Sequence, residues 1–537
     1  MSREQNALMF FQKYFRWIMI ALLALLYLGS VWQRPLYLGE EFRQAEIARE
    51  MTVSAPVPHL NGETLAGEPP LGHWGNAAVM ALIGEQPAAV RLSGALAVLL
   101  TAGLIFLLGR RSGIPRLGDA AALVWLFCGA VYAAGTCGSG DSLFVFFNTL
   151  TLTMFFFAIT EKALLHRAGY LALCGAGWGL AFLCRGAEAI LLPLIPAVVF
   201  LLWSRSWKEL CTLPWIPLVT AALIVGAWGL ALHRGGEALF AASGMVWSGG
   251  FSGDWLLSAL AGTLPWFLFL PMVWHGYRID FAGAVRTPLL RFAGCMLLMI
   301  PVAPFFYGGG AAFRLLPCFP AAAILFAYGM LRASDRGDYW WVNRVLNLLV
   351  WCLLPIPLLL FLLQTLAKFT RRVPSELVLY GFNENYYLPV LALMVMVIWF
   401  RMAAREPGGA RKFGCFCVGM AFFLLAVPIS LPWRFVRDFA PEPFLRQVLV
   451  PRATEDAIVQ AETSLMPAVA WTLKRTGIDT LPENPTGKRS AELSGGREFF
   501  IVTGDEARVR RLPAPRTTYR AGGLFVVHYP KSPEEWK

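Results

Sequence analysis

The sequence predicts an all-α polytopic membrane protein that carries a small α/β domain at its C-terminal end. The 537 residues are 57% hydrophobic and only 15% charged, whereas an ordinary soluble protein carries about a quarter charged residues. Apolar runs recur along the chain, and most reach the roughly 18 residues needed to cross a bilayer. Helices are expected, because a helix satisfies its own backbone polar groups in lipid.

The apolar runs divide the chain into thirteen expected membrane spans, with boundaries placed to within several residues. They cover residues 14–32, 88–109, 119–135, 144–160, 169–183, 187–204, 213–232, 256–275, 288–306, 314–331, 345–367, 388–400 and 413–432. The first run is interpreted as a retained helix, because no small-residue cleavage site follows Ser30.

The distribution of arginine and lysine predicts the orientation of the spans. With the N-terminus in the cytoplasm, every loop on that side is basic, from Arg110, Arg111 and Arg116 through to Arg411 and Lys412. This is the bias that orients inner-membrane proteins, and it accounts for the net charge of +12 without nucleic acid. An odd number of spans then places the C-terminal tail on the periplasmic side.

Two domains are expected: a transmembrane domain at 1–432, with a long periplasmic loop at 33–87, and a periplasmic domain at 433–537. The tail is polar and proline-rich, with strand-like runs at 498–503 and 523–529 and a helix-like run at 466–475. About a hundred residues suffice for a small folded domain.

The ten cysteines lie in or near the spans, and none lies in the last hundred residues. They are interpreted as small apolar fillers, with no disulfide framework and no zinc site. One bridge, between Cys137 and Cys184, stays open because both lie near the outer face.

The most informative segment is the start of the first outer loop, where Glu40, Glu41 and Arg43 follow the first span. Residues 40–51 have helical character and are expected to rest at the membrane interface. Carboxylates in the first helical turn face the positive end of the helix dipole and stay ionised, so Glu40 is a candidate general base. The alternative is a pair of solvated acids that begin a helix.

Four other polar residues fall on the same side of the predicted topology. His73, beside the interfacial Trp74, is a candidate phosphate ligand or a satisfied polar histidine. Asp141, at the outer mouth of a span, is a candidate functional acid or a helix cap. Arg185 and Arg314 are outward arginines in apolar surroundings and call for an anion. For Arg185 the alternative is an ion pair with Glu188 or Asp141.

These residues resemble the GT-C fold glycosyltransferases that use lipid-linked sugars, in the group of the protein O-mannosyltransferases and the lipid A aminoarabinose transferases. The resemblance lies in Glu40–Met51, in Leu60-Asn61-Gly62 with Pro69-Pro70-Leu71, and in Cys184-Arg185-Gly186, Leu316-Pro317-Cys318-Phe319 and the tail near Trp471. Glu40 replaces the family aspartate, Glu68 replaces a lysine, Arg185 replaces a lysine, and Arg314 stands where tyrosine is common.

The resemblance implies transfer of a sugar from a polyprenyl-phosphate carrier to a periplasmic-side acceptor such as lipid A, another glycolipid or a protein. Glu40, Glu41 and Asp141 are the expected catalytic residues, and Arg43, His73, Arg185 and Arg314 the expected substrate-binding residues. No metal ligands are expected, although a divalent cation between carboxylates and phosphate stays open. The alternatives are a membrane transporter and a catalytically inactive protein that binds the carrier lipid.

Overall fold

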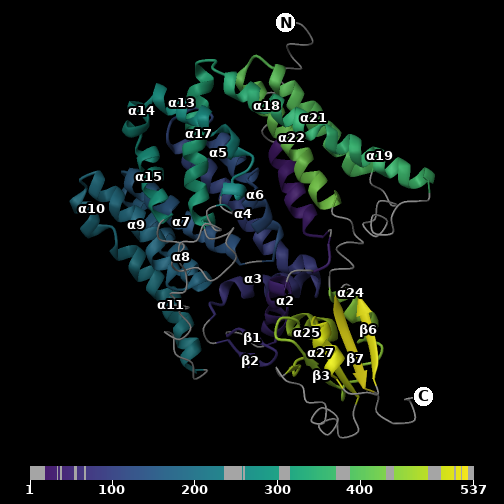
Figure 1. The fold of residues 1–537 in the computed structure, drawn as a ribbon. Helices are drawn as coiled ribbons and strands as arrows, with labels where there is room; N and C mark the ends of the chain where they lie inside the picture. Colours follow the sequence, from purple (N-terminus) through teal and green to yellow (C-terminus); the bar gives the residue numbers. More distant parts are fainter. Residues whose placement is uncertain are drawn as a thin grey trace.

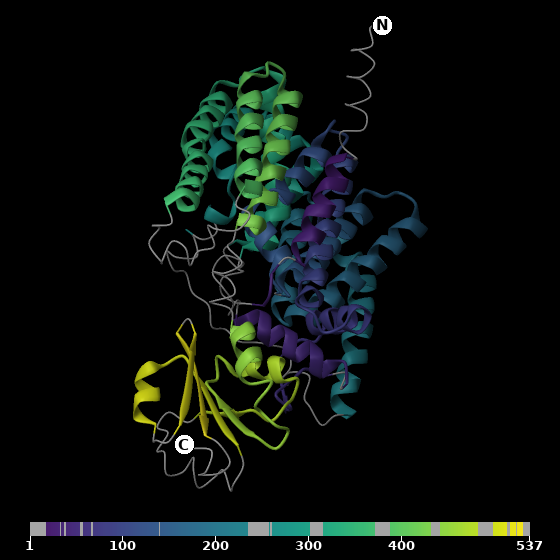
Figure 2. The ribbon, with the colours of Figure 1, turned by 90° about the vertical axis from the view of Figure 1, so that its right-hand side faces the viewer.

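The computed structural model describes residues 18–32, 34–36, 39–53, 57–65, 68–138, 140–234, 257, 260–300, 315–370, 387–430, 441–481, 498–512, 516–521 and 523–529. A helical bundle makes up most of these residues, and a small unit with a sheet is attached to one end of it (Figure 1). Between the bundle and the sheet lie two short helices from the first loop, α2 and α3 (Figure 2).

The bundle contains the long apolar helices of the chain. Its helices after the first one (Ile18–Ser30) are α4 (Pro87–Arg111), α5 (Leu117–Leu126), α6 (Gly129–Thr136), α7 (Asp141–Thr160), α8 (Leu164–Arg185), α9 (Glu188–Trp203), α10 (Trp207–Thr212), α11 (Trp215–Arg234), η2 (Trp266–Phe269), α13 (Leu270–Ile279), α14 (Phe281–Arg286), α15 (Pro288–Met296), η3 (Leu297–Met299), η5 (Leu316–Cys318), α17 (Phe319–Asp335), α18 (Trp340–Leu353), α19 (Pro355–Thr370), α21 (Tyr387–Arg405) and α22 (Gly409–Ser430).

The structure confirms a multi-pass membrane protein of predominantly helical fold. Seven helices of the described residues are long and apolar enough to cross a membrane, or eight if the bent pair α5–α6 is one span. Each of the thirteen expected spans overlaps at least one helix, and three of these helices are apolar but shorter. The expected count of thirteen is therefore approximate.

The first outer loop folds into two helices and a hairpin. These are α2 (Gly39–Met51), β1 (His59–Leu60), β2 (Glu63–Thr64) and α3 (Leu71–Ile83). The hairpin turn is Asn61-Gly62, whose φ angles of 57° and 81° are the left-handed pair that a two-residue turn requires. Both backbone N–H groups of this turn donate to the Glu50 carboxylate, at 2.5 and 3.0 Å, so the hairpin is fastened to α2.

The C-terminal unit is the small α/β fold that the tail predicts. Its helices are α24 (Pro441–Val448), α25 (Met466–Leu473) and α27 (Glu506–Arg511), and its strands are β3 (Ile458–Ala461), β4 (Asp479–Thr480), β5 (Phe499–Thr503), β6 (Thr517–Ala521) and β7 (Leu524–Tyr529). The strand order is β4-β3-β5-β7-β6. Strand β3 pairs in parallel with β4 and β5, while β7 pairs antiparallel with β5 and β6.

The C-terminal unit shares a hydrophobic core with the first outer loop. Phe42 and Ile47 of α2, Met80 of α3, and Val469 and Phe500 of the C-terminal unit all belong to this core. In addition, the Asn61 side chain exchanges two hydrogen bonds with the backbone of Ile478, at 2.7 and 2.8 Å. Helices α2 and α3 and the hairpin between them are therefore held from both sides, by the bundle and by the tail. We keep the domain boundary at 432/433 as a proposal, because residues 431–440 lie outside the described ranges.

All ten cysteines are free thiols, so the bridge left open between Cys137 and Cys184 is not formed.

Candidate active site

Helix α2 supplies the acidic residues of the site, and its two faces differ. The helix begins with Glu40 and Glu41 in its first turn, as an N-terminus favours. Glu41 is 1% exposed, whereas the Glu40 side chain is 56% exposed. Neighbouring carboxylates thus point in opposite directions, one into the protein and one out.

Glu41 is enclosed by arginine. The Arg91 guanidinium, which is fully buried, donates to both Glu41 oxygens at 2.9 Å in a bidentate pair. Its remaining donors go to the carbonyls of Val31, Arg34 and Pro35, where the chain leaves the first helix. Such an arrangement is stable only when every donor and acceptor is satisfied. The Glu41–Arg91 pair therefore joins the first helix, α2 and α4.

A second arginine connects this pair to the loop that precedes α7. Arg34 donates to Glu41 Oε1 at 3.3 Å and to the Thr136 carbonyl at 2.9 Å. The backbone N–H of Gly138 lies 3.5 Å from the same Glu41 oxygen. These contacts place Gly138, shortly before α7, directly beside the beginning of α2.

The exposed face of α2 carries an arginine whose charge is already neutralised. Arg43 pairs with Glu68, and Glu40 lies 3.8 Å from Arg43 while accepting from Gln44 Nε2 at 2.9 Å. The second oxygen of Glu68 lies 3.3 Å from His73 Nε2. Glu68, which replaces the family lysine, thus bridges an arginine and a histidine.

His73 lies in the first turn of α3, a helix too short to span a membrane, and it is buried. Burial lowers the pKa of His73 to about 4, and the nearby Arg43 charge acts in the same direction, with Glu40 opposing. The imidazole is therefore neutral at pH 7, and its contact with Glu68 is not an ion pair. If Nε2 carries the proton for Glu68, Nδ1 is an acceptor; it has no partner among the described residues.

The opposite wall of the site is an ion pair between two helices. Asp141, the first residue of α7, pairs with Arg185, the last residue of α8. The Asp141 side chain is buried, while a quarter of the Arg185 side chain stays exposed. A Cβ at Gly72 would lie only 3.6 Å from the Gly140 Cα, so the His73 and Asp141 segments are adjacent.

Glu188 adds a carboxylate near this ion pair. It is the first residue of α9, is 4% exposed, and lies within the electrostatic reach of Arg185. Its Oε1 atom is buried without a hydrogen-bond partner in the described part of the chain. An unpartnered buried carboxylate oxygen is costly, so this position is suited to a bound cation or a proton.

The structure brings together six of the seven expected site residues: Glu40, Glu41, Arg43, His73, Asp141 and Arg185. Arg314 lies outside the described residues. The described ranges contain no group of three histidine, cysteine or acidic residues that could hold a metal ion. Arg91 was missed, although an arginine within the apolar run at 88–109 is itself a signal of a functional or structural partner.

Three comparisons with known proteins agree with this architecture. Residues 67–228 match the family described as dolichyl-phosphate-mannose-protein mannosyltransferase. An undecaprenyl phosphate-α-4-amino-4-deoxy-L-arabinose arabinosyl transferase of Shewanella sediminis is 28% identical over 84% of this chain and 83% of its own length. A similarly named protein of Pseudomonas fluorescens is 24% identical over 95% of both chains.

The crystal structure of ArnT from Cupriavidus metallidurans bound to undecaprenyl phosphate superposes with a TM-score of 0.77, at 20% identity, over 95% of this chain and 97% of that one. Its apo form superposes with a TM-score of 0.76. The chain therefore has the fold of a GT-C membrane glycosyltransferase. Within that class, its sequence is similar to the aminoarabinose transferases.

Proposed function

We propose that the protein transfers an aminopentose from a polyprenyl-phosphate carrier to an acceptor such as lipid A, on the periplasmic side of the inner membrane. The observation that carries the proposal is the gathering of Glu40 and Arg43 of α2 with His73, Asp141 and Arg185 of the neighbouring helices. This gathering occurs at one end of a bundle whose fold matches a protein solved with undecaprenyl phosphate. The basic loops at the other end support the periplasmic placement.

The chemistry requires a base and a stabilised leaving group. The acceptor oxygen attacks the anomeric carbon, its proton passes to Glu40, and the electron pair of the breaking C–O bond stays on the carrier phosphate. Glu40 suits the role of base because its carboxylate is exposed on α2 and held by Gln44. Attack opposite to the departing phosphate gives inversion.

Arg43 and Arg185 suit the phosphate, because guanidinium groups bind its oxygens in a fixed geometry and stabilise the charge that develops on it. In the structure both are held by carboxylates, Glu68 and Asp141 respectively. The carrier phosphate would exchange with these partners on binding. Arg314 is retained as a proposed third cation. Glu41 is given a structural role instead of a catalytic one, since both of its oxygens are occupied by Arg91.

Glu188 supports an amino sugar as the transferred group. The relatives act on a 4-amino-4-deoxy sugar, whose ammonium group is a cation of the kind that a buried, unpartnered carboxylate oxygen can accept. Glu188→Gln is expected to raise the KM for the amino sugar donor about tenfold or more and to leave the KM for a neutral analogue unchanged.

The test is transfer of radiolabel from a polyprenyl-phosphate aminopentose to membrane acceptors by the purified protein. Glu40→Ala and Asp141→Asn should each lower kcat at least a hundredfold, whereas Glu63→Ala, an exposed acid on β2, should not change it. Arg185→Lys should retain more activity than Arg185→Gln. If the unmodified protein binds the carrier but transfers no sugar, the proposed enzymatic activity is wrong and the protein is a carrier-binding protein. If it neither binds the carrier nor transfers sugar, a transporter is favoured.

A further inference from the structure

The bundle contains a cavity at the end opposite to the C-terminal unit. Its volume is about 1350 Å³, and it lies between the first helix, α4, α5, α17 and α22. Figure 1 places the beginning of α22 and the end of α17 at the top of the bundle, while the sheet lies at the bottom. The cavity is therefore remote from the residues proposed for glycosyl transfer.

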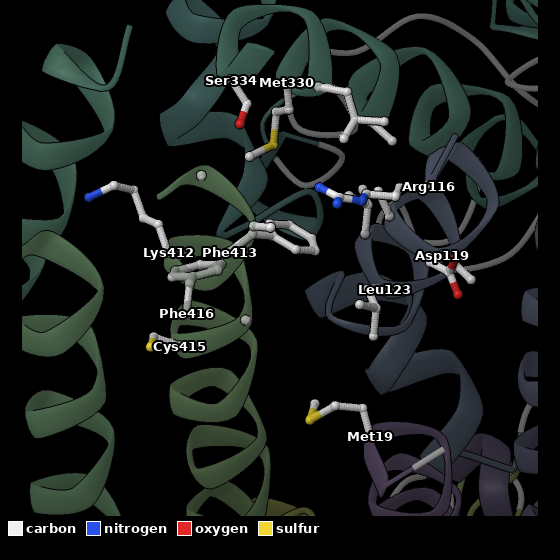
Figure 3. Close-up of a pocket in the computed structure, with 18 of the residues that line it drawn as sticks. Met19, Arg116, Asp119, Leu123, Met330, Ser334, Lys412, Phe413, Cys415 and Phe416 are labelled. Carbon is white, nitrogen blue, oxygen red and sulfur yellow. The ribbon is translucent and has the colours of Figure 1, made fainter. Parts of the chain in front are cut away.

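The lining of the cavity changes from polar at one end to apolar at the other. Polar side chains such as Arg116 and Ser334 gather at the end remote from the C-terminal unit, and apolar side chains such as Met19, Leu123 and Phe416 line the rest of the cavity (Figure 3). Figure 3 also shows the Arg116 guanidinium extending from the beginning of α5 into the open space, toward Phe413. This order of polar and apolar groups is that of one leaflet of a bilayer.

The polar end of the cavity, remote from the C-terminal unit, carries positive charge that acidic residues do not neutralise. The lining acids Asp335 and Glu406 pair with Arg332 and Arg411, at 3.5 and 3.8 Å. Asp119, the third lining acid, has a partner of its own. Lys412 donates to the neutral oxygens of Asn343 and Ala403, at 2.7 and 2.8 Å. The Lys412 ammonium is thereby buried between its neighbouring helices and is not available to a ligand in the cavity. Within the described ranges the Arg116 guanidinium forms no ion pair or hydrogen bond, so Arg116 provides an unneutralised positive charge at this end.

Water or a small solute does not fit this cavity well. Its volume exceeds the roughly 300–1,000 Å³ of an ordinary small-molecule site. Water would not stably fill its apolar part. Protein interiors are otherwise close-packed. A molecule with an anionic head group and long apolar chains satisfies both ends of the lining at once.

We propose that this cavity binds one anionic glycerophospholipid, with its phosphate at Arg116 and its acyl chains against Leu123 and Phe416. The basic loops assign this end of the bundle to the cytoplasmic leaflet, which is rich in anionic lipid. A polyprenyl phosphate is the other source of the same chemistry. It is disfavoured because the proposed transfer site needs the carrier phosphate at the opposite end of the bundle. The proposal does not depend on catalytic activity.

The test is native mass spectrometry of the full-length protein, purified and reconstituted with equal amounts of phosphatidylglycerol, phosphatidylcholine and undecaprenyl phosphate. The unmodified protein should retain one phosphatidylglycerol. Arg116→Ala should lower its occupancy at least fivefold, whereas Arg110→Ala, in the last turn of α4 and outside the lining, should not.

A second pair of variants tests the apolar part. Gly103 lines the cavity and Gly294 lies on α15, and a Cβ at either position would meet nothing within 4 Å. Gly103→Phe should exclude the lipid and Gly294→Phe should not, with thermal unfolding confirming that each variant is folded. Three results would overturn the proposal. The first is equal occupancy by phosphatidylglycerol in Arg116→Ala and Arg110→Ala, and the second is retention of phosphatidylcholine as strong as that of phosphatidylglycerol. The third is that undecaprenyl phosphate is the lipid whose retention depends on Arg116. The arginine comparison stands alone if Gly103→Phe does not fold.

Discussion

The Glu41–Arg91 and Asp141–Arg185 pairs use the same chemistry under different degrees of enclosure. Arg91 is fully buried, and its donors are used by Glu41 and by three backbone carbonyls. A quarter of the Arg185 side chain is exposed, and its partner lies at the beginning of a helix. The first pair has no capacity left for a ligand, whereas the second can exchange its partner. Enclosure, rather than charge, distinguishes the structural ion pair from the one proposed to bind the carrier phosphate.

The largest expected effect breaks the enclosed pair. Glu41→Gln leaves the buried Arg91 charge uncompensated and should lower the free energy of unfolding by about 3–5 kcal/mol. Asp141→Asn should cost about 1 kcal/mol or less, because Arg185 can then be hydrated. Denaturant unfolding in detergent checks both values. Equal costs for the two variants would show that enclosure does not distinguish the pairs.

An acid titration tests the enclosure of His73. Above pH 6.5 this residue is neutral in the folded and the unfolded chain. As pH falls from 6.5 to about 4, the unfolded chain takes up a proton that the folded protein excludes, so stability decreases. The loss should total roughly 3 kcal/mol. His73→Gln should remove this part of the pH dependence; an unchanged acid profile in that variant would contradict the burial of a neutral imidazole.

A smaller effect is expected where the first loop meets the tail. Asn61→Gly preserves the left-handed turn but removes the two hydrogen bonds to Ile478, and should cost about 1–3 kcal/mol. Lys474→Ala, which removes the 2.7 Å contact with Glu85 at a more exposed position, should cost less than about 1 kcal/mol. Proteolysis of the tail measures both, and greater cleavage in the lysine variant would reverse this order.

The smallest effect is expected at Glu68. Glu68→Lys breaks the partly exposed contact with Arg43 and should change stability by about 1 kcal/mol or less. It also restores the lysine of the family, so transfer activity should stay within tenfold of the unmodified protein. Glu63→Lys, on the same loop, serves as the control. Complete loss of transfer in Glu68→Lys alone would show that the loop is wrongly aligned with the family.

Hydrophobic runs predicted the bundle, and strand-like runs with turn residues predicted the α/β tail, because both signals are local. The outer-face residues were also identified from local chemistry, and the structure brings six of them together. The partner of each residue was not predictable in the same way. The sequence allowed either Asp141 or Glu188 as the ion-pair partner of Arg185. The observed pairing with Asp141 depends on how α7 and α8 pack.

Arg91 and the cavity show what the sequence could not provide. Arg91 lies fifty residues from Glu41, within an apolar run, and its role depends on three carbonyls that only the bend after the first helix presents. The cavity is formed by segments far apart in the sequence, from Met19 to Val418. Neither feature has a local pattern.

The shared core between the first outer loop and the tail determines the order in which this protein can be completed during synthesis. Helix α2 leaves the ribosome early, but its inner face belongs to a hydrophobic core that includes residues as late as Val526. Helix α2 therefore cannot complete its packing until nearly the whole chain has been synthesised. A premature stop within the last hundred codons would leave every membrane helix intact and still leave α2 without its partner.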